Sequence, residues 1–227
     1  MQAKVRTQIR FKGPEMEGPV ARWYAKLRRS GNQIEEYRKQ AAQLTEGLPA
    51  GARVLEVAPG PGYLAIEMAR LGFHVTGLDI SRTFVQIGNE NAREAGVNID
   101  FRQGDAAIMP FEGESFDLIV CQAAFKNFTQ PASALDEMYR VLRRGGTAVI
   151  QDMSSEASHA DIEHEVRKMQ LGWLSSFTTK ATLEILRRRA YSPARFQRLA
   201  AESAFKTCEI KKDGIGLEVR LQKAIGL

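Results

Sequence analysis

Apolar residues are distributed along the middle of the chain as short segments of strand length. Stretches with helical periodicity or turn-forming residues separate these segments. The predicted strands cover 53–58, 74–79, 98–102, 116–122 and 147–153. Strands that alternate with helices in this way predict a parallel sheet covered by helices on both faces.

Residues with strong positional preferences mark the ends of the predicted helices. Gly72 stands where a helix after the first strand would end, at about residue 71. Ser81 can cap a helix that continues to about residue 95 and ends at Gly96. Pro131 suits the first turn of a helix extending to 142, and the glycine pair 145–146 predicts a turn into the fifth strand.

The pattern changes after residue 153. Segment 154–190 is typical of consecutive helices, and four apolar positions in it recur at spacings of four, three and four. These positions, which predict one helical face, are Ile162, Val166, Met169 and Trp173. Ser192 and Pro193 begin another helix, which ends near 205.

The C-terminal residues predict a β-hairpin. Segments 206–212 and 217–223 are typical of strands, and the short link 213–216 contains two glycines. We therefore expect an α/β fold: a doubly wound, mostly parallel seven-stranded sheet with a C-terminal antiparallel hairpin and a helical lid insertion at 154–190. Residues 1–50 are expected to form an N-terminal segment with one helix that belongs to the lid, and 51–227 the main domain.

Composition narrows the class of protein. The chain is 44% hydrophobic and 26% charged, as is ordinary for a water-soluble domain. No apolar run approaches the roughly 20 residues of a membrane span, and the N-terminus lacks the apolar stretch of a secretion signal. Two cysteines, both in predicted strands, are too few for a disulfide framework or a structural zinc site. A cytoplasmic location is expected.

The net charge of +5 permits an anionic partner without requiring one. Lysines and arginines occur along the whole chain, and the densest run is 187–189. On a helix three consecutive residues point in different directions, so this run favours a solvated face over a binding patch for phosphate or nucleic acid.

The strongest chemical signal follows the first predicted strand. The chain passes from an apolar strand into a turn in which Gly60 and Gly62 lack Cβ atoms, so that backbone N–H groups at the next helix can approach a ligand closely. The same stretch also fits a dinucleotide fingerprint, with Ala65 at its last position.

Three acidic residues make the signal more specific. Glu56 lies inside the first strand, four residues before Gly60. Asp79 ends the second strand, where a carboxylate can accept hydrogen bonds from both ribose hydroxyls. Asp105 follows the third strand, where its carboxylate could accept a hydrogen bond from an adenine amino group.

With these residues the chain resembles the class I S-adenosylmethionine-dependent methyltransferases, and within them the small-molecule branch that includes the ubiquinone and menaquinone C-methyltransferases. The resemblance implies S-adenosylmethionine as cofactor and an in-line transfer of its methyl group to O, N or C of a small molecule. It extends over about 51–153 and more loosely over the terminal helix and hairpin. The cofactor-binding residues that it implies are Glu56, Ala58, Pro59, Gly60, Gly62, Asp79, Ile80, Asp105, Ala106 and Gln122.

The chain departs from the family pattern at Ala58, where the family usually has its first glycine. We expect the methyl group of this alanine to narrow the pocket slightly and cofactor binding to survive. No catalytic residue is assigned. The candidates for a base, which an acidic acceptor would need, are Tyr24, Lys126, His159 and His164. The two histidines are five positions apart and do not share a helix face, so they are poor joint metal ligands.

Other functions remain open from the sequence. A nicotinamide-dependent reductase is disfavoured because every tyrosine lacks a lysine four positions later and because of the terminal hairpin. A methyltransferase for RNA or protein is disfavoured because the fourth strand leads into 122–125 without the Pro-Pro-Tyr motif of enzymes that methylate exocyclic base amines. A non-catalytic cofactor-binding subunit is the third alternative. We expect a small-molecule partner rather than nucleic acid and make no prediction of oligomeric state.

Overall fold

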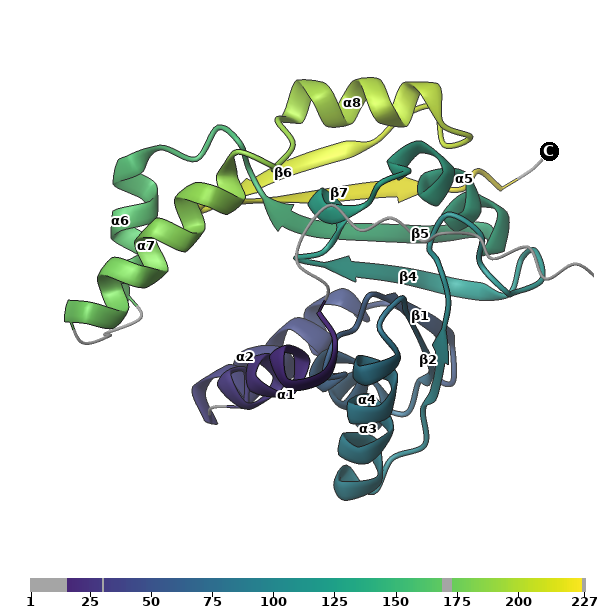
Figure 1. Cartoon of the computed structure of the whole chain (residues 1–227). Coiled ribbons are helices and arrows are strands. Elements are labelled where there is room, and N and C mark those ends of the chain that lie inside the picture. Colours follow the sequence, from purple (N-terminus) through teal and green to yellow (C-terminus); the bar gives the residue numbers. More distant parts are fainter. Residues whose placement is uncertain (1–15, 30, 169–172, 226–227) are drawn as a thin grey trace, which may run out of the picture.

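The computed structural model describes residues 16–29, 31–168 and 173–225, which contain a seven-stranded sheet with helices on both faces (Figure 1). The strands are β1 (Arg53–Val57), β2 (His74–Asp79), β3 (Asp100–Gln103), β4 (Phe116–Gln122), β5 (Leu142–Met153), β6 (Glu209–Asp213) and β7 (Gly216–Gln222). Their order is β3-β2-β1-β4-β5-β7-β6, and β7 runs in the direction opposite to that of the other six strands. The expected α/β fold is confirmed.

Alternate residues of the central strands face two separate cores. Leu55 of β1 and Ile119 of β4 point toward α5 (Pro131–Val141) and α8 (Pro193–Glu202). The residues next to them, Val54 and Val120, point toward the opposite face. That face is covered by α2 (Gly31–Leu44), α3 (Tyr63–Arg70) and α4 (Arg82–Ala95). Both faces of β1 and β4 are therefore buried, as the continuous apolar runs predict.

The capping signals of the sequence are confirmed. The Ser81 hydroxyl accepts from the Phe84 N–H at the start of α4, and Gly96 ends that helix at a φ of +70°. Gly72 follows α3 at a φ of +91°. Pro131 stands in the first turn of α5, and the Ser192 hydroxyl caps α8. The capping residues in the sequence thus predicted these helix ends correctly.

Several strand boundaries differ from the prediction. β5 begins at Leu142 and continues through the glycine pair, because Gly145 N–H donates to Lys223 O and Lys223 N–H donates to Gly146 O. β6 begins only at Glu209, so Cys208 precedes it. Asp213 pairs with Gly216, which leaves a two-residue hairpin loop in place of the four-residue link.

The N-terminal segment contains two helices instead of the one expected. The additional helix is α1 (Gly18–Leu27), which packs Ala21 and Ala25 against α4, while α2 packs on the sheet. Figure 1 shows α1 beside α2 and α4.

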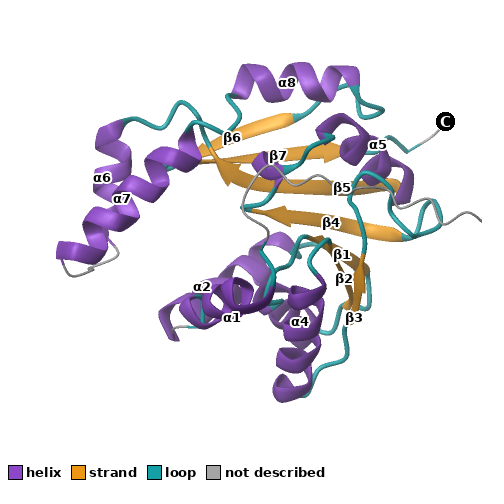
Figure 2. Ribbon diagram, viewed as in Figure 1, coloured by secondary structure: helices purple, strands orange, loops and turns teal. Residues whose placement is uncertain are grey.

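Segment 154–190 contains α6 (His159–Lys168) and α7 (Trp173–Arg187), which lie apart from the other helices in Figure 2. Ile162 and Val166 are buried on α6, as expected. Trp173 begins a separate helix, α7, so the four predicted positions do not belong to one helix. Met169 lies outside the described residues. Among the described helices, none has the length and apolarity needed to cross a bilayer.

Candidate cofactor-binding site

The turn between β1 and α3 contains two glycines in different surroundings. One faces empty space and the other is packed against a side chain. Gly60 and Gly62 have φ angles of +55° and +79°, and Gly62 N–H donates to Pro59 O at 3.0 Å. A Cβ on Gly60 would meet no atom within 4 Å, whereas one on Gly62 would lie 2.6 Å from Cζ of Phe101. Space for a ligand therefore adjoins Gly60, and Gly62 is required for packing.

Ala58 occupies a conformation that favours glycine. Its φ is +56°, and its N–H donates to Leu78 O at 2.7 Å. The left-handed conformation costs an L-residue about 1–2 kcal/mol. The sequence pointed to the alanine methyl as a steric feature of the pocket; the structure shows in addition a cost in the backbone itself, which sequence reasoning missed.

Glu56 is a buried carboxyl group with an unused polar atom. It is 3% exposed, and its Oε2 has no hydrogen-bond partner among the described residues. Burial raises the pKa of Glu56 to about 8, although a hydrogen bond from the Ala65 backbone opposes this shift. A buried, unsatisfied carboxyl is unfavourable unless a ligand uses it. This atom is therefore suited to a cationic or hydrogen-bond-donating ligand group.

Asp79 connects the ends of β1 and β2. Its Oδ2 accepts from Gly60 N–H at 3.0 Å, and its Oδ1 accepts from Ser81 N–H at 2.8 Å. Burial, and to a smaller extent nearby Glu17, raises the pKa of this carboxyl to about 6, although backbone N–H donors oppose the shift. A carboxylate offers about four lone pairs, so two N–H donors leave acceptor capacity for ligand hydroxyls.

A small cavity lies at the edge of the sheet where β2 and β3 end. Its walls include the predicted residues Ile80, Asp105 and Ala106. Asp105 Oδ1 accepts from Ala107 N–H at 2.9 Å, which orients the carboxylate. The opposite wall is the segment 127–130 after β4, which the sequence analysis did not assign. Its place after a strand that ends at the same edge was the available signal.

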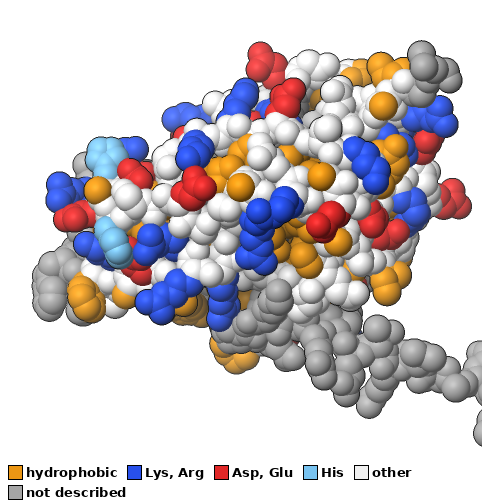
Figure 3. Space-filling model, turned by 90° about the horizontal axis from the view of Figure 1, so that it is seen from above, with side chains coloured by type: hydrophobic (Ala, Val, Ile, Leu, Met, Phe, Trp, Pro, Cys, Tyr) orange, Lys and Arg blue, Asp and Glu red, His pale blue; other side chains and the backbone are white. Residues whose placement is uncertain are grey.

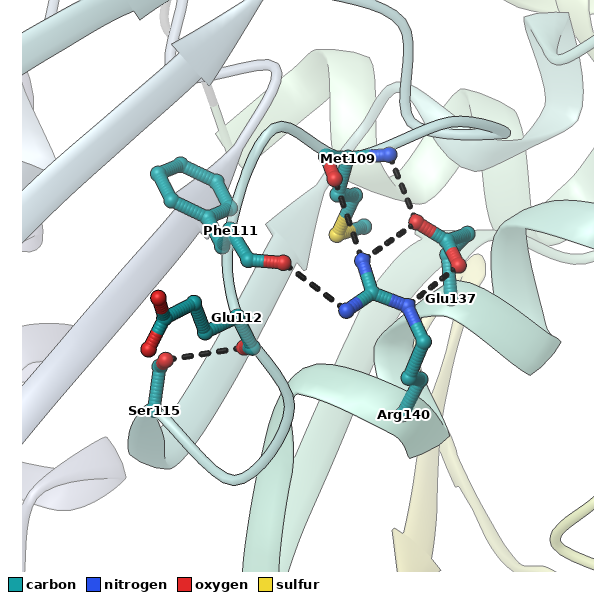
Figure 4. Close-up of polar contacts among 6 residues, drawn as sticks. All are labelled: Met109, Phe111, Glu112, Ser115, Glu137 and Arg140. Carbon is teal, nitrogen blue, oxygen red and sulfur yellow. Dashed lines mark hydrogen bonds and ion pairs between the residues drawn. The ribbon is translucent and has the colours of Figure 1, made fainter.

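The loop after β3 is fastened to α5 by one arginine (Figure 4). The Arg140 guanidinium donates to the carbonyl oxygens of Met109 and Phe111 at 3.0 and 2.8 Å. Glu137 pairs with Arg140 and also accepts from Met109 N–H at 2.7 Å. Because this loop contains Asp105 at its start, the network supports one wall of the cavity from outside.

Gln122 belongs to a row of polar side chains rather than to the turn. Its Nε2 donates to Gln40 Oε1 at 2.9 Å and to Gln151 Oε1 at 3.1 Å. Gln151 in turn donates to Glu218. The row joins α2 to β4, β5 and β7. Sequence reasoning found only Gln122, because nothing local shows that residues 40, 151 and 218 meet it.

Each candidate for a base either contacts other side chains or is exposed to solvent. Lys126, in the short 3-10 helix η1 (Phe125–Asn127), is buried, and its Nζ contacts Asp152 Oδ1 at 2.7 Å and Ala123 O at 2.5 Å. Tyr24 is half-buried and packs edge-on against Phe84. His159 and His164 are exposed on α6. The Lys126 ammonium is therefore already occupied by Asp152 and the Ala123 carbonyl.

The predicted residues thus form two connected groups. Glu56, Ala58, Pro59, Gly60 and Gly62 lie in or beside the turn, which Asp79 joins through its contact with Gly60. Ile80, Asp105 and Ala106 line the cavity. The two groups are linked because Ile80 follows Asp79 in the chain and because Gly104 N–H donates to Asp79 O at 2.9 Å. Gln122 instead bonds to Gln40 and Gln151, which belong to neither group.

Comparison with known proteins identifies the kind of domain. Residues 55–150 match a family model described as a methyltransferase domain. The demethylmenaquinone methyltransferase of Clavibacter sepedonicus is 36% identical over 107 residues, which cover 47% of this chain and 43% of that protein. A ubiquinone/menaquinone biosynthesis C-methyltransferase of Allorhizobium ampelinum is 36% identical over 118 residues, 50% of this chain and 46% of that one. The chain thus matches about half the length of these relatives.

Similarity to solved structures extends over more of the chain. A putative S-adenosyl-L-methionine-dependent methyltransferase from Methanococcus maripaludis has a TM-score of 0.71 at 22% identity and covers 95% of this chain and 97% of its own. A cyclase, SpnF, shares the fold with a TM-score of 0.57 at 21% identity, covering 87% and 84% of the two chains. At these identities the similarity establishes the fold, and the reaction has to be argued from the site.

Proposed function

We propose that this chain transfers a methyl group from S-adenosylmethionine to a small-molecule acceptor, because residues 55–150 match a methyltransferase domain and the similar proteins include quinone C-methyltransferases. The observation that supports this proposal most is the strand order, in which the antiparallel β7 lies between β5 and β6. A dinucleotide-binding sheet has the order 3-2-1-4-5-6 without this inserted strand. The sheet therefore argues against the nicotinamide-dependent alternative.

The described residues fit the proposed cofactor. When bound, S-adenosylmethionine supplies a methyl group that its sulfonium has already activated. Asp79 would accept from the ribose hydroxyls, and its fixed contacts with Gly60 and Ser81 would hold it in place. Asp105 would accept from the adenine amino group, with Ile80 and Ala106 against the ring. Gly60 offers open space for the methionine part of the molecule.

Glu56 would contribute charge to the same site. Its carboxyl is protonated at neutral pH when the site holds no cation, because burial raises its pKa to about 8. A cationic ligand group nearby favours the ionised form. We therefore expect cofactor affinity to rise with pH up to about 8 and to lose this dependence in Glu56→Gln.

The remaining task of the protein is to hold an acceptor atom in line with the methyl group and to exclude water. We propose that α6, α7 and the N-terminal helices cover the acceptor. The nucleophile can be O, N or C, and no described residue is assigned as its base. A cytoplasmic location is part of this proposal, and the free thiols of Cys121 and Cys208 support it.

Calorimetry tests the cofactor. We expect S-adenosylhomocysteine to bind with micromolar affinity. Neither NAD nor NADP should bind with comparable affinity. Asp79→Ala should weaken binding at least tenfold, because hydrogen bonds to a charged group contribute about 1.5–3 kcal/mol each. Asp213→Ala, which removes an exposed acid in the hairpin, is the control. Tighter binding of a nicotinamide cofactor would refute the methyltransferase assignment.

Transfer of radiolabelled methyl groups tests the acceptor class. We expect label in a metabolite extract rather than in total RNA or protein, because binding of a polymer requires basic residues gathered on one face. In Figure 3 the lysines and arginines on the visible face are interspersed with acidic residues. Label found chiefly in RNA, with strongly salt-dependent binding, would favour the polymer alternative. Cofactor binding without turnover would favour a non-catalytic subunit.

A further inference from the structure

Helix α1 exposes a stripe of three large apolar side chains. Val20, Trp23 and Leu27 are 47%, 65% and 58% exposed. Their spacing of three and four places them on one side of the helix. The opposite side of α1 is the one that packs, through Ala21 and Ala25, against α4. Single exposed apolar residues are common, but a contiguous stripe marks a surface that binds something.

Along the sequence, the positive charge is concentrated in the first 29 residues, which include this stripe. The first 29 residues contain eight lysines or arginines and two glutamates, a net charge of +6. The other 198 residues contain 24 basic and 25 acidic residues, a net charge of −1. On α1 itself, Arg22 and Lys26 are exposed next to the stripe. The segment is therefore both apolar and cationic, in a molecule that is otherwise close to neutral.

Polar contacts at both ends hold α1 in its place. The Glu17 carboxylate accepts from the N–H groups of Arg82 and Thr83 at 2.8 and 3.1 Å, and Gly18 N–H donates to Thr83 Oγ1. Near the other end, the Tyr63 hydroxyl donates to Ala25 O at 3.0 Å. These contacts attach α1 to the first turns of α3 and α4, the two helices that follow the glycine turn and Asp79.

We propose that the outer face of α1 docks on an anionic lipid surface. An amphipathic helix with a tryptophan and adjoining basic residues binds at the interface between headgroups and acyl chains, through apolar burial and attraction to anionic lipids. The charge complementarity of the +6 segment favours such a surface over a neutral one. Because α1 is fastened beside the cofactor turn, docking brings the proposed active site to the membrane surface.

Tryptophan fluorescence tests this proposal on the full chain. The protein contains two tryptophans, so Trp173→Phe leaves Trp23 as the only one. Vesicles of phosphatidylcholine and phosphatidylglycerol at 7:3, at low ionic strength, should shift the Trp23 emission to the blue and sediment the protein. Vesicles of phosphatidylcholine alone should bind at least tenfold more weakly, and added salt should release the protein from the anionic vesicles.

Substitutions separate the electrostatic contribution to vesicle binding from the apolar one. Arg22→Gln with Lys26→Gln should weaken binding roughly 30-fold, because each basic residue near the surface contributes about a fivefold factor. In the chain with both tryptophans, Trp23→Ser with Leu27→Ser should abolish sedimentation. The matched controls are Arg188→Gln with Arg189→Gln for charge and Leu71→Ser, half exposed after α3, for apolar surface. Both controls should bind as the unmodified chain does.

Three results would overturn the proposal. They are no binding to the anionic vesicles, equal binding to both vesicle types, and vesicle binding that the α1 variants leave unchanged. Light scattering would identify a different occupant if the stripe instead mediated a concentration-dependent dimer. Calorimetry with S-adenosylhomocysteine on each variant keeps this test separate from the proposed function, because failed lipid binding with intact cofactor binding contradicts only the docking surface.

Discussion

The ends of β1 and β2 and the helical pair α6–α7 are stabilised in different ways. Glu56 and Asp79 are 3% and 5% exposed, and Asp79 is fixed by two backbone N–H groups. Nearby, Ala58 adopts a left-handed conformation. This region contains buried charge and backbone strain that the surrounding core must offset.

The pair α6–α7 has little burial of its own. Its core is a small cluster around Ala157, Ile162 and Val166, and many of its polar contacts are exposed ion pairs. Exposed ion pairs contribute little stability. The difference indicates a rigid cofactor side and a covering segment that can open locally without unfolding the sheet. The following substitutions test this contrast.

The largest expected effect is at Glu56. Its pKa is about 8 in the folded chain against an ordinary value of 4.5, so the folded state keeps a proton that the unfolded state has lost. Stability therefore falls as pH rises from 4.5 to 8. Glu56→Gln should be more stable than the unmodified protein by on the order of 4 kcal/mol at pH 8, with the difference vanishing below pH 4.5. Urea unfolding of the ligand-free protein across this pH range measures it. A constant difference would show that Glu56 is ionised throughout.

Gly62→Ala should have the next largest effect on stability. The new Cβ would lie 2.6 Å from the Phe101 ring at a φ of +79°, so strain and overpacking should cost about 3 kcal/mol of folding free energy. Gly60→Ala is the matched control, since its Cβ meets nothing within 4 Å. It should cost about 1 kcal/mol, keep the fold and weaken cofactor binding. Thermal unfolding and calorimetry distinguish the two. Equal losses of stability would contradict the packing role of Gly62.

Ile162→Ala tests the covering segment. Ile162 is fully buried in the small cluster of α6, so its truncation should destabilise the pair locally by about 2 kcal/mol. Hydrogen exchange in α6 and α7 should then accelerate roughly 30-fold while amides of β1 and β4 stay unchanged. Glu163→Gln, which removes exposed ion pairs with Arg167 and Lys180, should leave both regions unchanged. Faster exchange in β1 would show that the two regions unfold together.

The smallest effect is at Ala58. Glycine removes the cost of the left-handed conformation but increases the entropy of the unfolded chain, so Ala58→Gly should stabilise the protein by about 0.5 kcal/mol. Ala65→Gly, inside α3, should act in the opposite direction, because it adds the entropic cost and removes a buried methyl group without relieving a left-handed conformation. A loss of stability in Ala58→Gly would mean that the alanine methyl packs favourably.

The sequence by itself determined the elements whose signals are local. Glycine and proline positions, the Ser81 cap and the apolar strands required only neighbouring residues, so the βα alternation and the C-terminal hairpin were predictable. The order of Glu56, Gly60, Asp79 and Asp105 also sufficed to indicate the cofactor. Each of these residues stands at a strand end or turn, and parallel strands place such ends at one edge of the sheet.

Only the tertiary structure decided contacts between distant segments. The continuation of β5 through the glycine pair depends on pairing with Lys223, and the left-handed Ala58 depends on its bond to Leu78. The contacts of Gln40 with Gln122, of Gln151 with Glu218 and of Glu17 with Arg82 each join residues more than 60 positions apart. Apolar periodicity cannot distinguish a helix face that packs from one that is exposed, because the packing partner is absent from the local pattern. For that reason the exposed stripe of α1 emerged only from the folded chain.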